Sequence, residues 1–214
     1  SLKKIFSGKT ILVTGGTGSI GSEVVRQLIS FSPKQIRVYS RDESKHYFLD
    51  QKLSEERSGV DIQYVIGDIR DEERLDLAFQ DVDIVFHAAA LKHVPYCETN
   101  LSEAVKTNVY GTQNVIKLAL LHNISRVVAI STDKAVNPNT VMGITKLLME
   151  RIVVSPPNHI NTSKTKFAVV RFGNVLFSRG SVVPTWIEQI KKGGPVTVTD
   201  RNMTRFFMSI PDAV

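Results

Sequence analysis

Three adjacent polar residues, Thr132, Asp133 and Lys134, follow a strand-like segment at residues 126–130, with only Ser131 between them. A threonine hydroxyl can polarise a substrate hydroxyl, and an aspartic acid can give a proton to a leaving group. A lysine can take a proton when burial or neighbouring positive charge lowers its pKa. The tripeptide therefore has the groups for acid–base chemistry, although elsewhere in a chain it would be interpreted as an exposed turn.

A glycine-rich turn near the start of the chain is the element that could bring a reactant to these groups. Its glycines, Gly15, Gly18 and Gly21, lie in the sequence TGGTGSIG, where Thr17 and Ser19 add hydroxyl donors. Residues without a Cβ let backbone N–H groups and a helix N-terminus approach a pyrophosphate. A strand pattern precedes the turn and a helical pattern follows it, which is the context of a dinucleotide-binding motif. An oxidised nicotinamide nearby would couple acid–base chemistry to hydride transfer.

The end of the second strand pattern indicates which dinucleotide is bound. Residues 35–39 are followed by Ser40, Arg41 and Asp42, with Lys45 one helical turn further on. A hydroxyl and a guanidinium suit a ribose 2′-phosphate, whereas an acidic residue here usually binds the 2′-hydroxyl of NAD. We therefore favour NADP over NAD, and Asp42 keeps NAD open.

Two further strand patterns also end in residues suited to a cofactor. Asp68 follows residues 62–66, where a third strand would meet an adenine ring, although a lone Asp is more often a helix N-cap and Asp71 is a candidate for that cap. The fourth pattern, at residues 83–87, is followed by three small residues that would let a flat cofactor lie against the backbone. These are Ala88, Ala89 and Ala90.

Two helical patterns contain residues that suggest a site. Asn108 lies within residues 102–121, and a polar Asn inside a helix is tolerated poorly unless its side chain bonds a partner. A second helix, beginning near Val141, contains Met142 and Lys146, which are four residues apart and so share a face.

Strand and helical patterns alternate along the whole chain. Strands are expected at residues 10–13, 35–39, 62–66, 83–87, 126–130 and 167–171, with a short one at 196–199. Helices are expected at residues 22–29, 43–57, 102–121, 141–155 and 183–191, and another begins at 210–214. This order predicts an α/β fold, a doubly wound parallel sheet of the Rossmann type with helices on both faces. Ligands of such sheets bind off the carboxyl ends of the strands, where every polar cluster above falls.

Composition limits the alternatives. The 214 residues are 42% hydrophobic and 22% charged, which is typical of a soluble globular domain, and no apolar run could span a bilayer. The net charge of +6 comes from scattered basic residues, which favours anionic ligands over a nucleic-acid interface. The single cysteine, Cys97, excludes an internal disulfide and fits a reducing compartment.

The chain resembles an extended short-chain dehydrogenase/reductase. Within that class it is similar to the nucleotide-sugar 4,6-dehydratases that act on UDP-N-acetylglucosamine in polysaccharide and glycan biosynthesis. The matching segments cover nearly the whole chain in order: TGGTGSIGSE from Thr14, YSRDE from Tyr39, GDIRD from Gly67, FHAAALKHVP from Phe86, STDKAVNP from Ser131, VMGITK from Val141, RFGNV from Arg171, SRGSVVP from Ser178 and MTRFF from Met203.

The resemblance implies roles for the matching residues. In such enzymes the oxidised cofactor takes hydride from C4 of the sugar, the C5 proton leaves, water is lost from C6 and hydride returns to C6. Lys134 would be the base at C5, Asp133 the acid at C6 and Thr132 the partner of the C4 hydroxyl, while Lys146 would hold the nicotinamide ribose. NADP contacts are expected from Gly15, Thr17, Gly18, Ser19, Ile20, Gly21, Ser40, Arg41, Lys45, Asp68, Ile69, Ala88, Ala89, Ala90, Asn108 and Lys146. Substrate contacts are expected from Lys92, His93, Met142, Asn174, Arg179, Ser181 and Arg205, and no metal is expected.

One departure from the wider class affects the choice of reaction. The class has a Tyr four residues before the helix lysine as acid or base, whereas this chain has Met142, whose thioether cannot transfer a proton. A subset of the dehydratases also has Met here, and the acceptor of the C4 hydroxyl proton stays open, with Thr132 and either a water or Asp133 as our choice. A UDP-sugar 4-epimerase and a non-enzymatic NADP-binding module are the alternatives.

The resemblance also predicts organisation and setting. We expect residues 1–172 to form the NADP-binding core and residues 173–214 the start of a smaller nucleotide-sugar-binding lobe, truncated because family members continue well past Val214. A chain that begins SLKKIFSGK, without Met, is expected to be a fragment with no signal peptide. We expect a UDP-sugar and further copies of the chain as partners, with no nucleic acid and no membrane contact from this fragment. The expected location is cytoplasmic, and a membrane tether through an absent upstream segment is left open.

Overall fold

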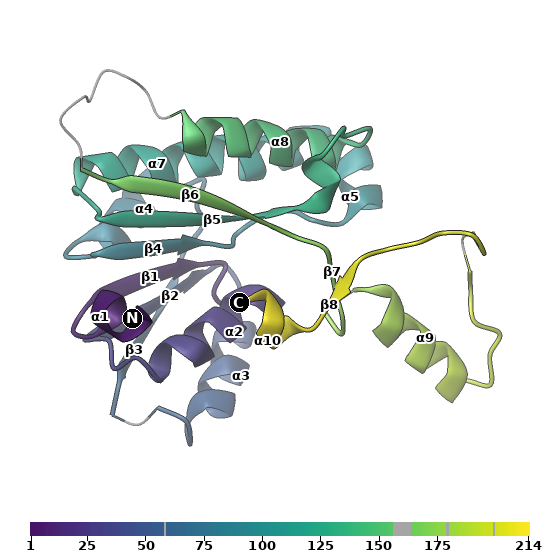
Figure 1. Ribbon diagram of the computed structural model, residues 1–214, viewed down its shortest axis with the longest axis horizontal. Helices are drawn as coiled ribbons and strands as arrows, with labels where there is room; N and C mark the ends of the chain where they lie inside the picture. Colours follow the sequence, from purple (N-terminus) through teal and green to yellow (C-terminus); the bar gives the residue numbers. More distant parts are fainter. Residues whose placement is uncertain (58, 156–163, 179, 199) are drawn as a thin grey trace.

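The computed structural model describes residues 1–57, 59–155, 164–178, 180–198 and 200–214. Its centre is a parallel six-stranded sheet with the order β3-β2-β1-β4-β5-β6 (Figure 1). The strands are β1 (Thr10–Thr14), β2 (Gln35–Ser40), β3 (Asp61–Ile66), β4 (Ile84–His87), β5 (Arg126–Thr132) and β6 (Lys166–Phe172). The predicted doubly wound α/β fold is therefore confirmed.

Helices cover both faces of this sheet. Ile11 and Val13 of β1 face α2 and α3, and Leu12 between them faces α4 and α7, because successive side chains of a strand point to opposite faces. All five residues of β1 are buried, as expected for a central parallel strand. The α-helices that precede β6 in the chain are α1 (Leu2–Phe6), α2 (Ser19–Ile29), α3 (Glu43–Leu53), α4 (Glu72–Phe79), α5 (Val94–Thr99), α6 (Leu101–Val105), α7 (Gly111–Leu121) and α8 (Val141–Val154).

Side-chain caps fix where three of these helices begin. Asp42 accepts a hydrogen bond from Lys45 N at the start of α3, and Thr140 accepts one from Gly143 N at the start of α8. Asp71 caps α4 through Arg74 N, which confirms the cap expected there. Since Asp71 caps α4, the side chain of Asp68 is not used as a helix cap and can belong to the site at the strand ends.

Two helical predictions need correction. The helix expected at residues 102–121 begins at Leu101 and contains a π-helical turn, η1 (Lys106–Tyr110), between α6 and α7. A Cβ at Gly111, where α7 begins, would stand 2.5 Å from a terminal carbon of Ile69, so this residue lets the helix approach the loop after β3. The helix expected at 43–57 ends at Leu53, and Arg57 beyond it pairs with Asp50.

The chain after β6 leaves the sheet. Two strands of two residues each, β7 (Asn174–Val175) and β8 (Phe207–Met208), pair in parallel, and α9 (Val182–Lys191) lies between them in sequence. The last helix, α10 (Ile210–Ala213), returns to α2 (Figure 1). The strand expected at 196–199 is wrong for residues 196–198, and residue 199 lies outside the described residues. The backbone of Thr197 is bonded by the side chains of Trp186 and Gln189 on α9, so it has no strand partner.

None of the helices in the described part of the chain is long and apolar enough to cross a membrane.

Candidate active site

A cavity of about 860 Å³ lies at the carboxyl ends of the strands, between the sheet and the segment after β6. Among the residues expected in the site, those that line it are Gly15, Thr17, Gly18, Ser19, Ile20, Gly21, Ser40, Arg41, Lys45, Asp68, Ile69, Ala88, Ala89, Ala90, Lys92, His93, Thr132, Lys134, Met142, Lys146, Asn174 and Ser181. Asp133, Asn108 and Arg205 do not line it, and Arg179 lies outside the described residues.

The glycine turn has the geometry of a phosphate cradle. Gly15 has φ +67°, and a Cβ there would stand 2.6 Å from the backbone N of Ala89. A Cβ on Gly21 would collide with the carbonyl oxygen of Gly15. The backbone of the turn is therefore open to the cavity at the N-terminus of α2, the kind of position where proteins bind phosphate groups.

The end of β2 presents hydroxyl and guanidinium groups beside the turn. Ser40 Oγ lies 2.7 Å from Thr17 Oγ1, so the two hydroxyls share a hydrogen bond. The Arg41 side chain is 53% exposed and reaches Asp68 at 3.4 Å. Lys45 Nζ is 2.6 Å from a carboxylate oxygen of Asp42. Asp42 and Asp68 are the two acidic residues expected near the cofactor. Asp42 already caps α3 and pairs with Lys45.

A buried histidine lies beneath the cavity, and no residue pattern in the sequence marks it as part of the site. His87 at the end of β4 lies between two hydroxyls, with Nδ1 2.7 Å from Thr14 Oγ1 and Nε2 3.0 Å from Thr112 Oγ1. Thr112 donates its own proton to Asn108 O, so Nε2 carries the ring proton and Nδ1 accepts from Thr14. Burial and the charge of Lys146 lower the pKa of His87 to about 3. The register of β1 against β4 is the feature that brings this group together, because it places Thr14 opposite His87 at the ends of the two strands.

Asn108 shapes the cavity without lining it. Its Oδ1 accepts from Leu91 N at 2.8 Å, and its Nδ2 donates to Leu91 O at 2.9 Å and to Thr145 Oγ1 at 3.0 Å. These bonds satisfy the buried amide from within the π-helical turn η1 and fix the loop that continues from Ala90. The structure thus explains how a polar Asn is accommodated in this helix.

Thr132, Asp133 and Lys134 form one hydrogen-bonded cluster at the end of β5. Asp133 Oδ1 accepts from Thr132 Oγ1 at 2.9 Å and from Lys134 Nζ at 3.1 Å. Lys134 Nζ also donates to Asn174 Oδ1 of β7 at 2.8 Å. Burial alone would raise the pKa of Asp133, but the bonds from Lys134 and Thr132 bring it below its ordinary value. The cluster therefore links the sheet to the segment after β6.

Lys146 on α8 is a buried ammonium at the floor of the cavity. Its Nζ donates to the carbonyl oxygen of Ile130 on β5 at 2.6 Å. Burial lowers the pKa of Lys146 from 10.5 to about 8, and the charge of Glu150 offsets part of this effect. Met142, one turn earlier on the same helix face, is 3% exposed and packs with Cys97 and Ala104.

The remaining substrate candidates differ in how they are placed. His93 lies against Gly180, where a Cβ would stand 2.5 Å from the imidazole Cε1. Burial and the charge of Lys92 lower the pKa of His93. Arg205 Nη1 donates to the backbone of Thr204 in an exposed segment and stays a prediction for substrate. Within the described residues, no group of three or more His, Cys, Asp and Glu could hold a metal ion.

Comparison with known proteins assigns this architecture to a family. Residues 11–214 match the family model described as polysaccharide biosynthesis protein. The whole chain is 56% identical to 63% of a Methanocaldococcus jannaschii protein described as an uncharacterized membrane protein. It is 44% identical to a UDP-N-acetylglucosamine 4,6-dehydratase (inverting) of Campylobacter jejuni and to a UDP-glucose 4-epimerase of Rickettsia bellii, each match covering 98% of the chain and 62% of the relative.

A solved structure shows the same likeness in three dimensions. The structure described as Pen from Bacillus thuringiensis is 43% identical, with a TM-score of 0.93 over 97% of this chain and 65% of that one. The chain thus spans less than two thirds of the length of these relatives, which agree with the resemblance stated from the sequence motifs. The chain belongs to the polysaccharide biosynthesis protein family, among homologues of the UDP-N-acetylglucosamine 4,6-dehydratases.

Proposed function

We propose that this chain is the cofactor-binding part of an NADP-dependent enzyme that dehydrates UDP-N-acetylglucosamine to the 4-keto-6-deoxy sugar. The observation that carries the proposal is the bonded cluster of Thr132, Asp133 and Lys134, which adjoins the cavity that the glycine turn lines. The relative named as a dehydratase, at 44% identity, supports it. The division into a core of residues 1–172 and a sugar-binding lobe of residues 173–214 is part of this proposal.

The chain's residues would handle the protons of this reaction. When bound, NADP⁺ would take a hydride from C4 of the sugar and return it at C6. Lys134 Nζ would remove the C5 proton, Asp133 would protonate the hydroxyl that leaves C6, and Thr132 would hold the C4 hydroxyl. A proton exchanged with solvent would return to C5 when the hydride returns to C6. Met142 cannot move a proton, so the C4 hydroxyl proton passes to Thr132 with a water or to Asp133.

The observed hydrogen bonds supply a route to the required proton positions. In the ion pair, Lys134 is an ammonium and Asp133 is a carboxylate. The reaction needs the opposite protonation states, a neutral amine on Lys134 as base and a carboxylic acid on Asp133 as proton donor. When the C4 hydroxyl proton leaves through Thr132 and a water, Asp133 can receive one proton along the 3.1 Å contact from Lys134 Nζ, which produces a neutral amine and a carboxylic acid together. A substrate that excludes water removes solvation from the charged pair and favours this transfer. Asn174 Oδ1 keeps the amine oriented in both states.

Cofactor binding would follow from the cradle and the end of β2. The turn at Gly15 would hold the pyrophosphate, and Arg41 with Ser40 would face the 2′-phosphate. Asp68 and Ile69 would meet the adenine, and Lys146 Nζ would bond the nicotinamide ribose. Its pKa of about 8 leaves part of Lys146 neutral at physiological pH, which would also reduce its repulsion of an oxidised nicotinamide.

A UDP-sugar 4-epimerase is the second candidate, because a relative named UDP-glucose 4-epimerase is also 44% identical. An epimerase needs a hydride acceptor at C4 but no acid at C6. The bonded pair of Asp133 and Lys134 has a role in dehydration and no assigned role in epimerisation. We therefore rank the epimerase second.

Product analysis separates the two reactions. The whole protein is incubated with UDP-N-acetylglucosamine and NADP⁺ in heavy water, and the sugar is followed by NMR. We expect a 4-keto-6-deoxy product with solvent deuterium at C5, and its loss in Lys134→Met by at least a hundredfold, as for removal of a general base. Lys117→Met, which breaks only a surface pair with Glu72, is the matched control. A changed C4 configuration without C5 deuterium would establish the epimerase instead.

A further inference from the structure

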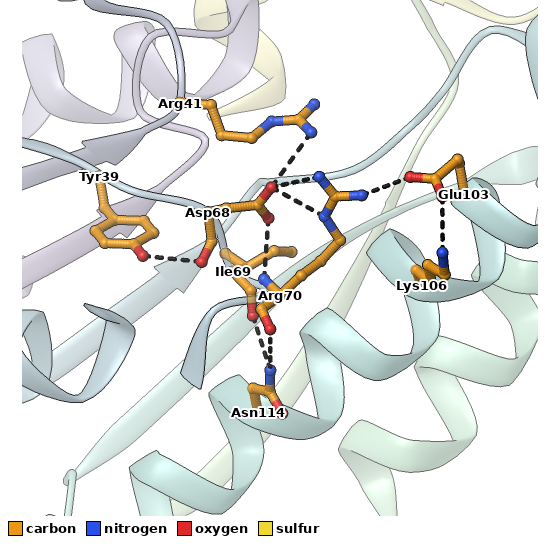
Figure 2. Close-up of polar contacts among 8 residues, drawn as sticks. All are labelled: Tyr39, Arg41, Asp68, Ile69, Arg70, Glu103, Lys106 and Asn114. Carbon is orange, nitrogen blue, oxygen red and sulfur yellow. Dashed lines mark hydrogen bonds and ion pairs between the residues drawn. The ribbon is translucent and has the colours of Figure 1, made fainter. Parts of the chain in front are cut away.

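Arg70 does not line the cavity, yet it holds a residue that does. Its Nε and Nη2 donate to Asp68 Oδ2 at 2.9 and 2.6 Å, and its backbone N donates to Asp68 Oδ1 at 2.9 Å (Figure 2). The third guanidinium nitrogen, Nη1, reaches Glu103 of α6 at 2.5 Å. Arg70 is thus fixed at both ends, and it fixes Asp68.

The contacts continue as a chain of alternating charge across the adenine end of the cavity. Lys106 Nζ lies 3.0 Å from Glu103, Glu103 bonds Arg70, Arg70 bonds Asp68, and Asp68 reaches Arg41 (Figure 2). Three cations and two carboxylates leave one positive charge in excess. Lys106 stands at one end of this chain of charges, and Arg41 at the other end lines the cavity.

Arg41 and Arg70 compete for the same carboxylate oxygen. Asp68 Oδ2 lies 2.6 Å from Arg70 Nη2 but 3.4 Å from Arg41 Nη1. The Arg41 side chain is 53% exposed and that of Arg70 33%, so the contact of Arg41 is both the longer and the more solvated. Such a pair is easily exchanged for a better anion.

We propose that Arg70 is a positioning residue that sets the preference for a 2′-phosphorylated dinucleotide, by occupying Asp68 and leaving Arg41 available to the phosphate. Tyr39 supports the arrangement by donating from its hydroxyl to Asp68 O at 2.9 Å (Figure 2). Without Arg70, the carboxylate of Asp68 would hold Arg41 as its remaining side-chain partner in this network. The proposal rests on the proposed function, since it assumes that the cavity binds a nicotinamide dinucleotide.

The test measures binding and needs no turnover. Dissociation constants of NADP⁺ and NAD⁺, and of 2′,5′-ADP and 5′-AMP as half-ligands, are measured by calorimetry on the wild type and on Arg70→Gln. We expect the ratio of NADP⁺ to NAD⁺ affinity to fall about three- to tenfold in the variant, because Arg41 is recaptured by Asp68. The two half-ligands should show the same change of ratio.

Three variants separate positioning from general effects. Arg74→Gln removes the same charge from the same segment, but Arg74 Nε donates to the backbone oxygen of Ile66 at 2.9 Å, so the ratio should stay as in the wild type. Arg70→Lys should restore part of the ratio. Adding Asp68→Asn to Arg70→Gln should restore it further, because no carboxylate is left to hold Arg41.

The outcomes distinguish this inference from the proposed function. A wild type that binds neither dinucleotide overturns both. A wild type that binds them, with an unchanged ratio in Arg70→Gln or an equal loss for NADP⁺ and NAD⁺, overturns the positioning role alone. A ratio that falls equally in Arg74→Gln shows that net charge, and not the contact with Asp68, is responsible.

Discussion

Lys146 is the residue whose surroundings depart most from those of an ordinary lysine. It is 7% exposed, its ammonium donates to the backbone of Ile130, and burial lowers its pKa to about 8. An unfolded chain would hold this proton up to about pH 10.4. Between about pH 8 and 10.4 the unfolded state therefore binds more protons, so this residue makes stability rise with pH there.

This prediction is tested by unfolding in denaturant at pH 7.5 and pH 10. We expect the wild type to gain roughly 2 kcal/mol relative to Lys146→Met over this interval, which is most of the value of a shift of this size, because pH 10 still lies below the unfolded pKa. The variant is the reference because all other titrating groups are common to both proteins. Equal changes in the two proteins would mean that the Lys146 amine is solvated in the folded state.

At the scale of elements, the turn between β1 and α2 depends on particular glycines to different extents. A Cβ at Gly21 would meet the backbone of Gly15 and Gly16, neither of which can move without displacing the turn. A Cβ at Gly18 would stand 3.1 Å from Gly15 O, where a small shift is sufficient. Both substitutions add one methyl group within the same turn.

We therefore expect Gly21→Ala to cost about 2–3 kcal/mol of stability and to abolish dinucleotide binding, because overpacking against backbone is expensive. Gly18→Ala should cost about 1 kcal/mol or less and weaken binding only partly. Chemical denaturation and calorimetric titration with NADP⁺ on both variants provide the comparison. If the two variants behaved alike, the close approach of α2 to the turn would not be what the spacing of these glycines serves.

Element patterns allowed much of the fold to be predicted from the sequence. The six strands were found because each is a short apolar run bounded by polar or turn residues, and their alternation with helices implies a parallel sheet. The strand predicted at residues 196–198 is wrong because side chains of α9, eight to eleven positions earlier, bond the backbone of Thr197. The bonding of Asn108 in the π-helical turn could not be predicted, since its partners Leu91 and Thr145 approach only in the folded chain.

The candidate site was predictable where strand ends gather residues, and not where side chains combine. Thr132, Asp133 and Lys134 are adjacent in sequence, so their cluster needed only the position of β5. Asn174 was expected to contact substrate. Its bond to Lys134 depends on the path that the chain takes from β6 into β7. The contact of Arg70 with Glu103 joins residues 33 positions apart on a loop and a short helix, which no sequence period indicates.

At the scale of the whole molecule, the cavity connects parts of the chain that are otherwise joined by few contacts. Its lining runs from Gly15, in the turn after β1, to Phe207 in β8. Across it, the segment after β6 meets the core through Lys134 with Asn174 and through His93 with Gly180. A ligand that fills the cavity would add contacts to both parts, so it should stabilise the folded chain as a unit.

The last prediction concerns this coupling of binding to stability. NADP⁺ at about 100 times its dissociation constant should add about 2.7 kcal/mol and raise the melting midpoint by roughly 5–10 °C for a chain of this size. With a net charge of +6 and an anionic ligand, the increase at a fixed ligand concentration should shrink as salt is added. Differential scanning fluorimetry at two salt concentrations measures both effects. Nicotinamide riboside, which carries no phosphate, is the control and should shift the midpoint little. A midpoint unmoved by NADP⁺ would mean that the open cradle at Gly15, whatever its shape, gains nothing from the anion, because any ligand bound to the folded state alone must raise it.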